Sequence, residues 1–304
     1  MPLPSDPPSS PFVPPAPPDP ATLPLPSPSR PAPGVRLLRG AVYQLLEGSR
    51  ALELDVWLPE DAGAPVPLIV FVHGGGWRTG LRDNLGPRFR SWQPGPFARL
   101  VQAGFAVACL DYRLSGEAHF PAQRDDVTAA LGWLRTRADE LGVDASRTVL
   151  WGESAGAHLA AHAALAAPAE GAGPVRGCVC WYVPSDLVAL AEDHGGGYDA
   201  HDPATYEARL LGAAAGADPE RARAASPVAH VTAQAPPFLL LHGTADTAVP
   251  TRQSVRLADA LREAGAPMEL RLIEGAQHLW LGVPDERVTE CFERSVEFTR
   301  ARTR

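Results

Sequence analysis

The sequence contains no lysine, since all 27 of its basic residues are arginine. A lysine Schiff base, a P-loop and pyridoxal-phosphate chemistry are therefore excluded. Cysteine is scarce too: there are four, and only Cys178 and Cys180 lie close together, a spacing that fits neither a zinc site nor a disulfide scaffold. The N-terminus lacks the basic and apolar regions of a secretory signal. We expect a cytoplasmic protein with buried free thiols.

Long hydrophobic runs are absent as well. No apolar segment approaches the roughly 20 residues that span a bilayer, so we expect no membrane span. Positive charge is in deficit, with 35 acidic against 27 basic residues and a net charge of -8, which repels phosphate backbones. We therefore expect no nucleic-acid partner. The length of 304 residues fits one α/β domain and leaves a homodimer open.

Proline is concentrated at the start of the chain, where residues 1–33 hold 15 of the 33 prolines. Such density removes backbone donors and favours extended polyproline II, with too few apolar side chains to bury. The sequence predicts a disordered tail over residues 1–34 and a folded domain over residues 35–304. A PxxP ligand for an SH3-like partner is the alternative interpretation of the tail.

From Val35 the pattern becomes that of a folded α/β protein. Val35–Leu38 and Leu52–Leu58 predict an antiparallel pair of strands. Short apolar runs then alternate with helical stretches, as buried parallel strands with crossover helices require. The runs cover residues 68–72, 106–110, 148–151, 177–182, 238–241 and 268–273, and the helical stretches cover residues 121–141, 155–167, 251–264 and 284–300. The fold class is α/β, with a mostly parallel eight-stranded sheet and helices on both faces.

A candidate nucleophile follows the strand predicted at residues 148–151. Gly152-Glu153-Ser154-Ala155-Gly156 has the pattern G-x-S-x-G and opens an alanine-rich helix, which is the context of a nucleophile elbow. The backbone at such a serine is strained, and Gly152 and Gly156 must lack side chains so that turn and helix can approach. The sequence therefore predicts Ser154 as the nucleophile.

A glycine loop follows the strand predicted at residues 68–72. His73-Gly74-Gly75-Gly76-Trp77 lets the backbone run close to a substrate and aim N–H groups at a carbonyl oxygen that becomes negative in the transition state. We predict an oxyanion hole formed by the N–H groups of Gly75, Gly76 and Ala155.

A serine nucleophile needs a histidine to accept its proton and an acid to orient that histidine. The strand at residues 238–241 leads into Asp246, and the strand at residues 268–273 leads into His278. The chain order Ser154, Asp246, His278 and the position of all three beyond strand ends predict a catalytic triad. His73 and His242 are interpreted as residues that brace loops.

Other polar and aromatic residues have less specific patterns. His158 and His162 lie one helical turn apart, but Leu159 stands where a zinc protease needs glutamate, so we expect no metal there. Residues 184–235 fit neither helical nor strand periodicity, which predicts a cap insertion over the carboxyl edge of the sheet. Its acids and histidines between 193 and 202 are interpreted as a polar loop, so no metal and no cofactor are expected. Four aromatic residues near the catalytic loops could build an apolar pocket or belong to the core: Trp77, Trp181, Tyr182 and Trp280. Of these, Trp77 and Trp280 are the candidates for binding substrate.

Together these motifs resemble the α/β-hydrolase superfamily, and within it the hormone-sensitive-lipase-like and feruloyl/acetylxylan-esterase-like carboxylesterases. Residues 111–114, with Phe120-Pro121-Ala122 and Asp125, look like that family's segment after its fourth strand. The resemblance covers residues 35–304 and implies hydrolysis of a small-molecule carboxylic ester through an acyl-enzyme. The aromatic residues near the catalytic loops indicate a small or aromatic acyl group. Arg113 and Asp125 are interpreted as a structural ion pair.

Three further interpretations stay open on the same residues. An arylformamidase-like amidase and an acyl transferase would use the same triad, and sequence alone separates neither from an ester hydrolase. A non-catalytic ligand-binding protein of this fold is the third, and the presence of His278 argues against it.

Overall fold

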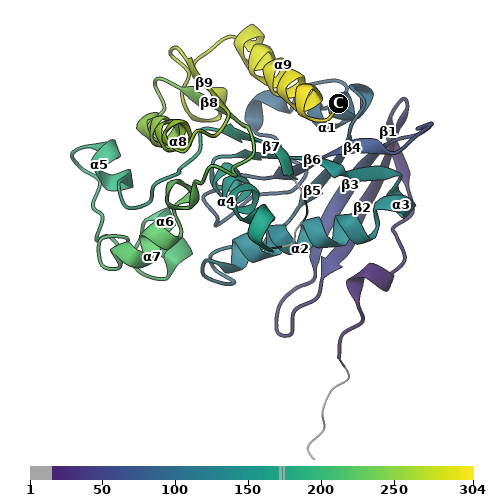
Figure 1. Cartoon of the computed structure of the whole chain (residues 1–304), viewed down its shortest axis with the longest axis horizontal. Coiled ribbons are helices and arrows are strands. Elements are labelled where there is room, and N and C mark those ends of the chain that lie inside the picture. The colour runs from purple at the N-terminus through teal and green to yellow at the C-terminus, as the bar shows by residue number, and fades with distance from the viewer. Residues whose placement is uncertain (1–15, 171–172, 174) are drawn as a thin grey trace, which may run out of the picture.

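The computed structural model describes residues 16–170, 173 and 175–304. The strands of these residues form one nine-stranded sheet in the order β1-β2-β3-β5-β4-β6-β7-β8-β9 (Figure 1). They are β1 (Ser29–Ala32), β2 (Val35–Gln44), β3 (Leu52–Pro59), β4 (Val66–Val72), β5 (Ala106–Leu110), β6 (Val143–Glu153), β7 (Val175–Trp181), β8 (Phe238–Gly243) and β9 (Met268–Ile273). All pairs among β4 to β9 are parallel. The pairs β1–β2, β2–β3 and β3–β5 are antiparallel. The predicted α/β class and the opening antiparallel pair are confirmed.

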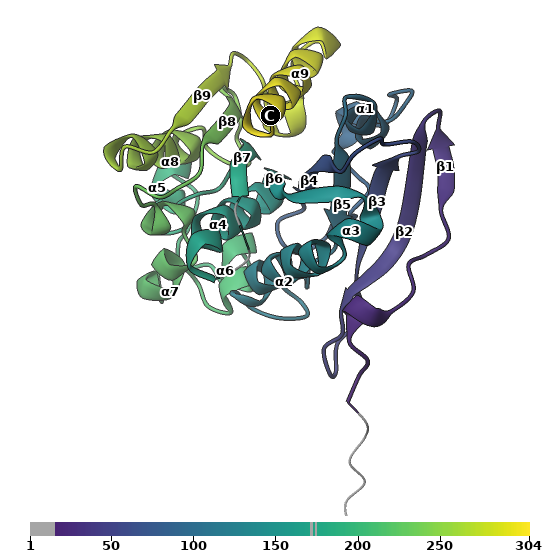
Figure 2. The same cartoon turned by 45° about the vertical axis from the view of Figure 1, so that its right-hand side comes forward.

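Helices cover both faces of the sheet because its central strands are apolar on both sides. The longer helices are α1 (Pro96–Gln102), α2 (Ala122–Thr136), α4 (Ala155–Glu170), α8 (Arg252–Glu263) and α9 (Asp285–Arg302), with a short α3 (Ala138–Leu141). α2, α4 and α8 pack on one face and α1 and α9 on the other, so two separate hydrophobic layers form (Figure 2). The single helix predicted at residues 121–141 is broken at Arg137, which leaves helical geometry.

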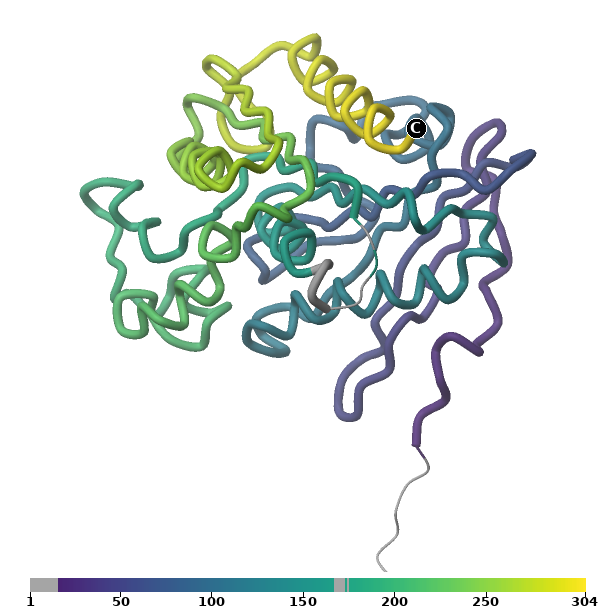
Figure 3. The backbone as a smooth tube through the Cα atoms, viewed as in Figure 1, coloured from purple at the N-terminus to yellow at the C-terminus, as the bar shows by residue number. Residues whose placement is uncertain are grey.

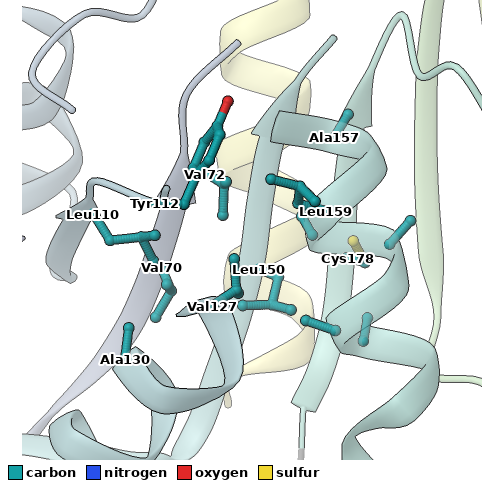
Figure 4. Close-up of a cluster of buried hydrophobic side chains, with 14 of the residues drawn as sticks. Val70, Val72, Leu110, Tyr112, Val127, Ala130, Leu150, Ala157, Leu159 and Cys178 are labelled. Carbon is teal, nitrogen blue, oxygen red and sulfur yellow. The ribbon is translucent and has the colours of Figure 1, made fainter. Parts of the chain in front are cut away.

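Side chains of alternating residues on one strand enter opposite layers. In β4, Val70 and Val72 face the layer under α2 and α4, while Ile69 and Phe71 face α1 and α9. Figure 4 shows the first layer, in which strand residues Val70, Val72, Leu110 and Leu150 meet helix residues Val127, Ala130, Ala157 and Leu159. Packing from both sides fixes the strand ends on which the site is built.

The N-terminal segment corrects two predictions. Residues 20–22 form a 3-10 helix, η1, and β1 adds a ninth strand to the predicted eight. Trp133 Nε1 donates a hydrogen bond to the carbonyl of Pro20, and Arg137 donates to the carbonyls of Ala21 and Leu23. The prediction of a disordered tail is therefore wrong for residues 16–34, because donors of α2 and the loop after it satisfy the carbonyls of this proline-rich chain. Residues 1–15 lie outside the described residues.

The segment between β7 and β8 includes residues 184–235, for which the sequence predicts a cap insertion. It forms α5 (Leu190–His194), α6 (Tyr206–Leu211), α7 (Pro219–Ala224) and the 3-10 helix η3 (Pro227–His230). Figure 3 follows it from teal to green at the end of the molecule that lies away from β1. We call residues 184–235 the cap. Within the described ranges, no helix is both long and apolar enough to cross a membrane.

Candidate active site

The turn at Ser154 joins β6 to α4 in a strained conformation. Ser154 has φ 51°, a value that L-residues rarely adopt. A Cβ at Gly152 would lie 2.3 Å from the carbonyl oxygen of Gly156, and one at Gly156 would lie 2.0 Å from that of Val72. Only glycine therefore allows the turn, the helix and β4 to approach this closely. The geometry is that of the predicted elbow.

The structure brings the three predicted triad residues together. His278 Nε2 lies 3.1 Å from Ser154 Oγ, and His278 Nδ1 lies 2.7 Å from Asp246 Oδ2. With Nδ1 protonated, His278 donates to the carboxylate and its Nε2 accepts from the serine hydroxyl. The segments that carry them follow β6, β8 and β9, whose carboxyl ends meet at one edge of the sheet.

Asp246 is held by more groups than sequence reasoning identified. Its side chain is fully buried, and Oδ1 accepts hydrogen bonds from the backbone N–H groups of Ala248 and Val249, each at 2.9 Å. His242 Nε2 lies 3.4 Å from Oδ2. Burial alone would raise the pKa of Asp246, but hydrogen bonds from His242 and His278 and the N–H groups hold that pKa well below its usual value. The carboxyl is therefore ionised at neutral pH.

His242 braces the acid loop, as its sequence position suggested. Its Nε2 donates to the carbonyl of Val249 at 2.9 Å and its Nδ1 accepts from Ser254 Oγ at 2.7 Å. The ring is completely buried. With both nitrogens engaged, His242 fixes the loop that carries Asp246.

The glycine loop faces Ser154 with free donors. Gly75 and Gly76 have φ of 114° and 61°, so this conformation strongly favours glycine. The N–H groups of Gly75, Gly76 and Ala155 donate no hydrogen bond within the described part of the chain. A Cβ at Gly76 would also lie 2.6 Å from the ring of Tyr206 in the cap. The loop is thus closed in by the cap while its donors stay available.

Glu153 is a site residue that sequence reasoning missed, and it contacts Tyr182, which the sequence placed among the aromatic residues near the catalytic loops. The Tyr182 hydroxyl donates to Glu153 Oε2 at 2.8 Å, and its ring centroid lies 4.6 Å from that of His278. Burial raises the pKa of Glu153, and the hydrogen bonds from Tyr182 and from the N–H of Gly74, which lower that pKa, offset the rise only in part. Glu153 therefore connects the glycine loop to the residue that packs on His278. The sequence signal that could have identified Glu153 is its position inside the G-x-S-x-G motif, directly before Ser154.

The two candidate substrate-binding tryptophans lie in different places. Trp77 lines the cavity next to Ser154, and its Nε1 donates to His158 Nδ1 at 3.2 Å. Trp280 does not line that cavity; it is 1% exposed and packs edge-on against Trp181. The prediction that Trp280 contacts substrate is corrected, because its ring fills the layer under α9.

A cavity of about 500 Å³ opens at Ser154. The glycine loop, the elbow and His278 line it together with residues of the cap: Pro184, Leu190, His194, Tyr198, Tyr206 and Glu207. This volume suits a small ester. The cap thereby contributes side chains to the site, although its sequence shows no recognisable pattern.

The remaining polar clusters have structural partners. Both His158 Nε2 and His162 Nε2 donate to the carbonyl of Ala225, at 2.7 and 2.8 Å. Of the described residues, no group of three or more histidines, cysteines and acids could hold a metal ion.

In the cap, Asp193 accepts hydrogen bonds from Gln253 and Arg256 of α8. Arg113 pairs with buried Asp126, not with Asp125 as predicted, because the buried side of α2 carries Asp126.

Known proteins resemble this chain over most of its length. The model of the BD-FAE family matches residues 54–261, more than half of the chain. The esterase LipQ of Mycobacterium tuberculosis (strain ATCC 25618 / H37Rv) is 32% identical over 230 residues, which are 72% of this chain and 52% of LipQ. The chain spans about half the length of the curated relatives it matches.

Solved structures share the fold. A truncated carbohydrate esterase from gut microbiota gives a TM-score of 0.73 at 26% identity, covering 88% of this chain and 96% of that one. Esterase 2 of Thermogutta terrifontis phosphonylated by sarin gives a TM-score of 0.68 at 29% identity, and the match covers 88% of this chain and 94% of that one. The same esterase is also similar in structures with propionate and with butyrate bound.

Proposed function

Because the chain belongs to the BD-FAE family, we propose that it is a serine esterase that cleaves carboxylic esters of small or aromatic acyl groups. The observation that carries the proposal is the hydrogen-bonded series from Asp246 Oδ2 through His278 to Ser154 Oγ, at 2.7 and 3.1 Å. A serine hydroxyl becomes nucleophilic when a base in this position takes its proton.

In the proposed reaction, Ser154 Oγ attacks the ester carbonyl while His278 Nε2 accepts the hydroxyl proton. The developing imidazolium is stabilised by ionised Asp246. The carbonyl oxygen becomes negative and accepts hydrogen bonds from the N–H groups of Gly75, Gly76 and Ala155. His278 then returns the proton to the leaving alcohol, and an acyl group remains on Ser154.

Water completes the cycle. His278 takes a proton from a water molecule that attacks the acyl carbonyl, and the acid leaves as Ser154 regains its proton. Tyr182, packed on the His278 ring, supports the imidazole in one orientation. The chain thus needs only side chains and backbone donors for both half-reactions.

The cavity supports the proposed substrate size. Its volume of about 500 Å³ accepts a short or aromatic acyl group with a modest alcohol. That the related Thermogutta terrifontis esterase was solved with propionate and with butyrate agrees with a small acyl group.

Turnover of matched substrates tests the proposal. Wild-type protein and Ser154→Ala are compared on p-nitrophenyl acetate, p-nitrophenyl benzoate and the corresponding anilides. We expect the wild type to favour the esters and Ser154→Ala to lose several orders of magnitude in kcat/KM. Anilide cleavage faster than ester cleavage would favour an amidase, and unchanged activity in Ser154→Ala would remove the serine from its role.

A further inference from the structure

The cap places a buried carboxylate in the wall of the cavity. Glu207, in α6, is only 3% exposed and lines the cavity that opens at Ser154. Both of its side-chain oxygens lie 2.8 Å from the hydroxyl of Tyr198, which has a single proton to donate. The carboxylate can accept several more hydrogen bonds than Tyr198 supplies.

No positive charge compensates Glu207 in the described residues. None of the ion pairs between described side chains includes it, whereas Asp193 and Asp126 each pair with an arginine. Arg90 also lines the cavity, but its side chain is exposed and forms no ion pair with Glu207. A buried carboxylate without a cation is costly unless a partner arrives in the complex.

The groups around Glu207 suit a cation as its partner. The rings of His194 and Tyr198 stack with centroids 4.2 Å apart, and both line the cavity. Burial lowers the pKa of His194, so at neutral pH it adds no positive charge of its own. Burial and the nearby Glu207 raise the pKa of Tyr198, which therefore stays a neutral donor. Aromatic faces beside a carboxylate are a favourable surrounding for an alkylammonium group.

We propose that Glu207 is a specificity residue that binds a protonated amine on the substrate. The proposal rests on the proposed esterase function, since it concerns the same cavity. A neutral hydroxyl would satisfy a lone pair of Glu207, whereas an ammonium would also neutralise its charge. The inferred substrates are therefore esters that carry a tertiary or primary ammonium some atoms away from the scissile bond.

Isosteric ester pairs test this proposal. 2-(Dimethylamino)ethyl acetate is compared with 3-methylbutyl acetate, and ethyl 4-(dimethylamino)butanoate with ethyl 5-methylhexanoate, so that the amine lies on either side of the ester. For at least one pair, we expect wild-type kcat/KM to be about 10- to 100-fold higher for the charged ester. Glu207→Gln should reduce that ratio to about one. The ratio is informative even if folding suffers, because a loss of folded enzyme lowers both rates equally.

Two variants serve as controls. Glu220→Gln changes an exposed glutamate of the cap helix α7 and should keep the wild-type ratio. Tyr198→Phe removes the internal donor to Glu207 and should keep or increase the ratio. A wild-type ratio near one, or a high ratio that survives Glu207→Gln, would overturn the subsite.

A third pair separates charge from hydrogen bonding. If Glu207→Gln weakened only the preference for glycerol monoacetate over propyl acetate, the site would bind hydroxyls and the proposal would be wrong. Hydrolysis of the neutral esters by wild type, lost in Ser154→Ala, tests the esterase function separately from the subsite.

Discussion

Asp246 shows how burial and hydrogen bonding together make a permanent negative charge. Burial disfavours the ionised carboxyl, but three hydrogen-bond donors and the nearby Nε2 of His242 more than reverse that effect. The donors are His278 and two backbone N–H groups. The ionised acid holds the proton of His278 on Nδ1, which leaves Nε2 free to accept the proton of Ser154. The charge of this one residue therefore sets the tautomer on which the proposed reaction depends.

The first prediction concerns this residue. Asp246→Asn should lower kcat by about 10³- to 10⁴-fold, because the amide favours the wrong tautomer of His278. KM should change little, since Asp246 does not contact substrate. Steady-state kinetics on p-nitrophenyl acetate measure both. Asp259→Asn, on the exposed face of α8, is the matched control, and near-normal kcat in Asp246→Asn would exclude it as the acid.

Single residues differ in how far sequence predicts them. Ser154, Asp246 and His278 were predicted because each occupies a motif directly after a strand. Glu153 and Glu207 were missed, and the contacts of Tyr182 with Glu153 and His278 were not predicted, because these roles depend on contacts between segments distant in sequence. Asp125 and Asp126 are neighbours, and only the buried side of α2 decides which of them meets Arg113.

At the scale of elements, the elbow depends on the close approach of α4 to β4. A Cβ at Gly156 would lie 2.0 Å from the carbonyl oxygen of Val72 and 2.4 Å from that of His73. Both are backbone atoms, so neither can rotate away. The second prediction is that Gly156→Ala lowers both the melting temperature and kcat/KM.

Gly132→Ala is the control for this second prediction. Gly132 lies in α2, and its Cβ would meet no atom within 4 Å. Alanine there should leave activity unchanged and stabilise the helix by up to about 1 kcal/mol. If Gly156→Ala had the melting temperature and the kcat/KM of wild type, the close approach of α4 to β4 would not be required for the geometry at Ser154.

The N-terminal segment shows where sequence patterns mislead. β4 to β8 were predicted because their residues are apolar on both faces, while β1 is an exposed edge strand with a proline and no apolar pattern. Its binding depends on partners that no local signal shows: antiparallel pairing with β2 and donors from Trp133 and Arg137.

The third prediction follows from those contacts. A chain that starts at residue 35 should melt roughly 5 °C below one that starts at residue 16, for a loss of about 2 kcal/mol. Its specific activity below the melting transition should be unchanged, because β1 lies at the opposite edge of the sheet from β8 and β9. Thermal unfolding followed by circular dichroism makes the comparison. Equal melting temperatures would mean that residues 16–34 add nothing to stability.

For the whole molecule, buried histidines couple stability to pH. Burial lowers the pKa of His158 to about 4 and that of His162 well below its usual value. The unfolded chain therefore binds more protons than the folded one between pH 6.5 and about 4. Stability is fully present above pH 6.5 and falls as the pH is lowered through this window.

The fourth prediction is the size of that loss. His158 alone should contribute on the order of 3 kcal/mol between pH 7 and pH 4. Urea unfolding at several pH values gives the slope, and replacing His162 by phenylalanine should make it shallower. His201→Gln, which changes an exposed cap residue, should leave the pH dependence of the unfolding free energy unchanged. An unfolding free energy that is constant from pH 7 to pH 4 would contradict this assignment.

Fold class and the positions of most strands followed from sequence, whereas the order of the strands in the sheet and the shape of the cavity did not. Parallel strands and crossover helices leave regular apolar patterns, but the cap folds around the site through isolated contacts such as Tyr206 on Gly76. The cytoplasmic location and a homodimer stay predictions.

The central claim is that Ser154 is a nucleophile activated by His278. The most direct measurement is peptide mass spectrometry after treatment with a p-nitrophenyl alkylphosphonate, which reacts much faster with an activated serine than with other side chains. We predict one phosphonyl adduct, on Ser154, formed in step with the loss of esterase activity and absent in Ser154→Ala. Complete inactivation with the adduct on another residue, or unimpaired esterase activity with Ser154 fully modified, would contradict the account.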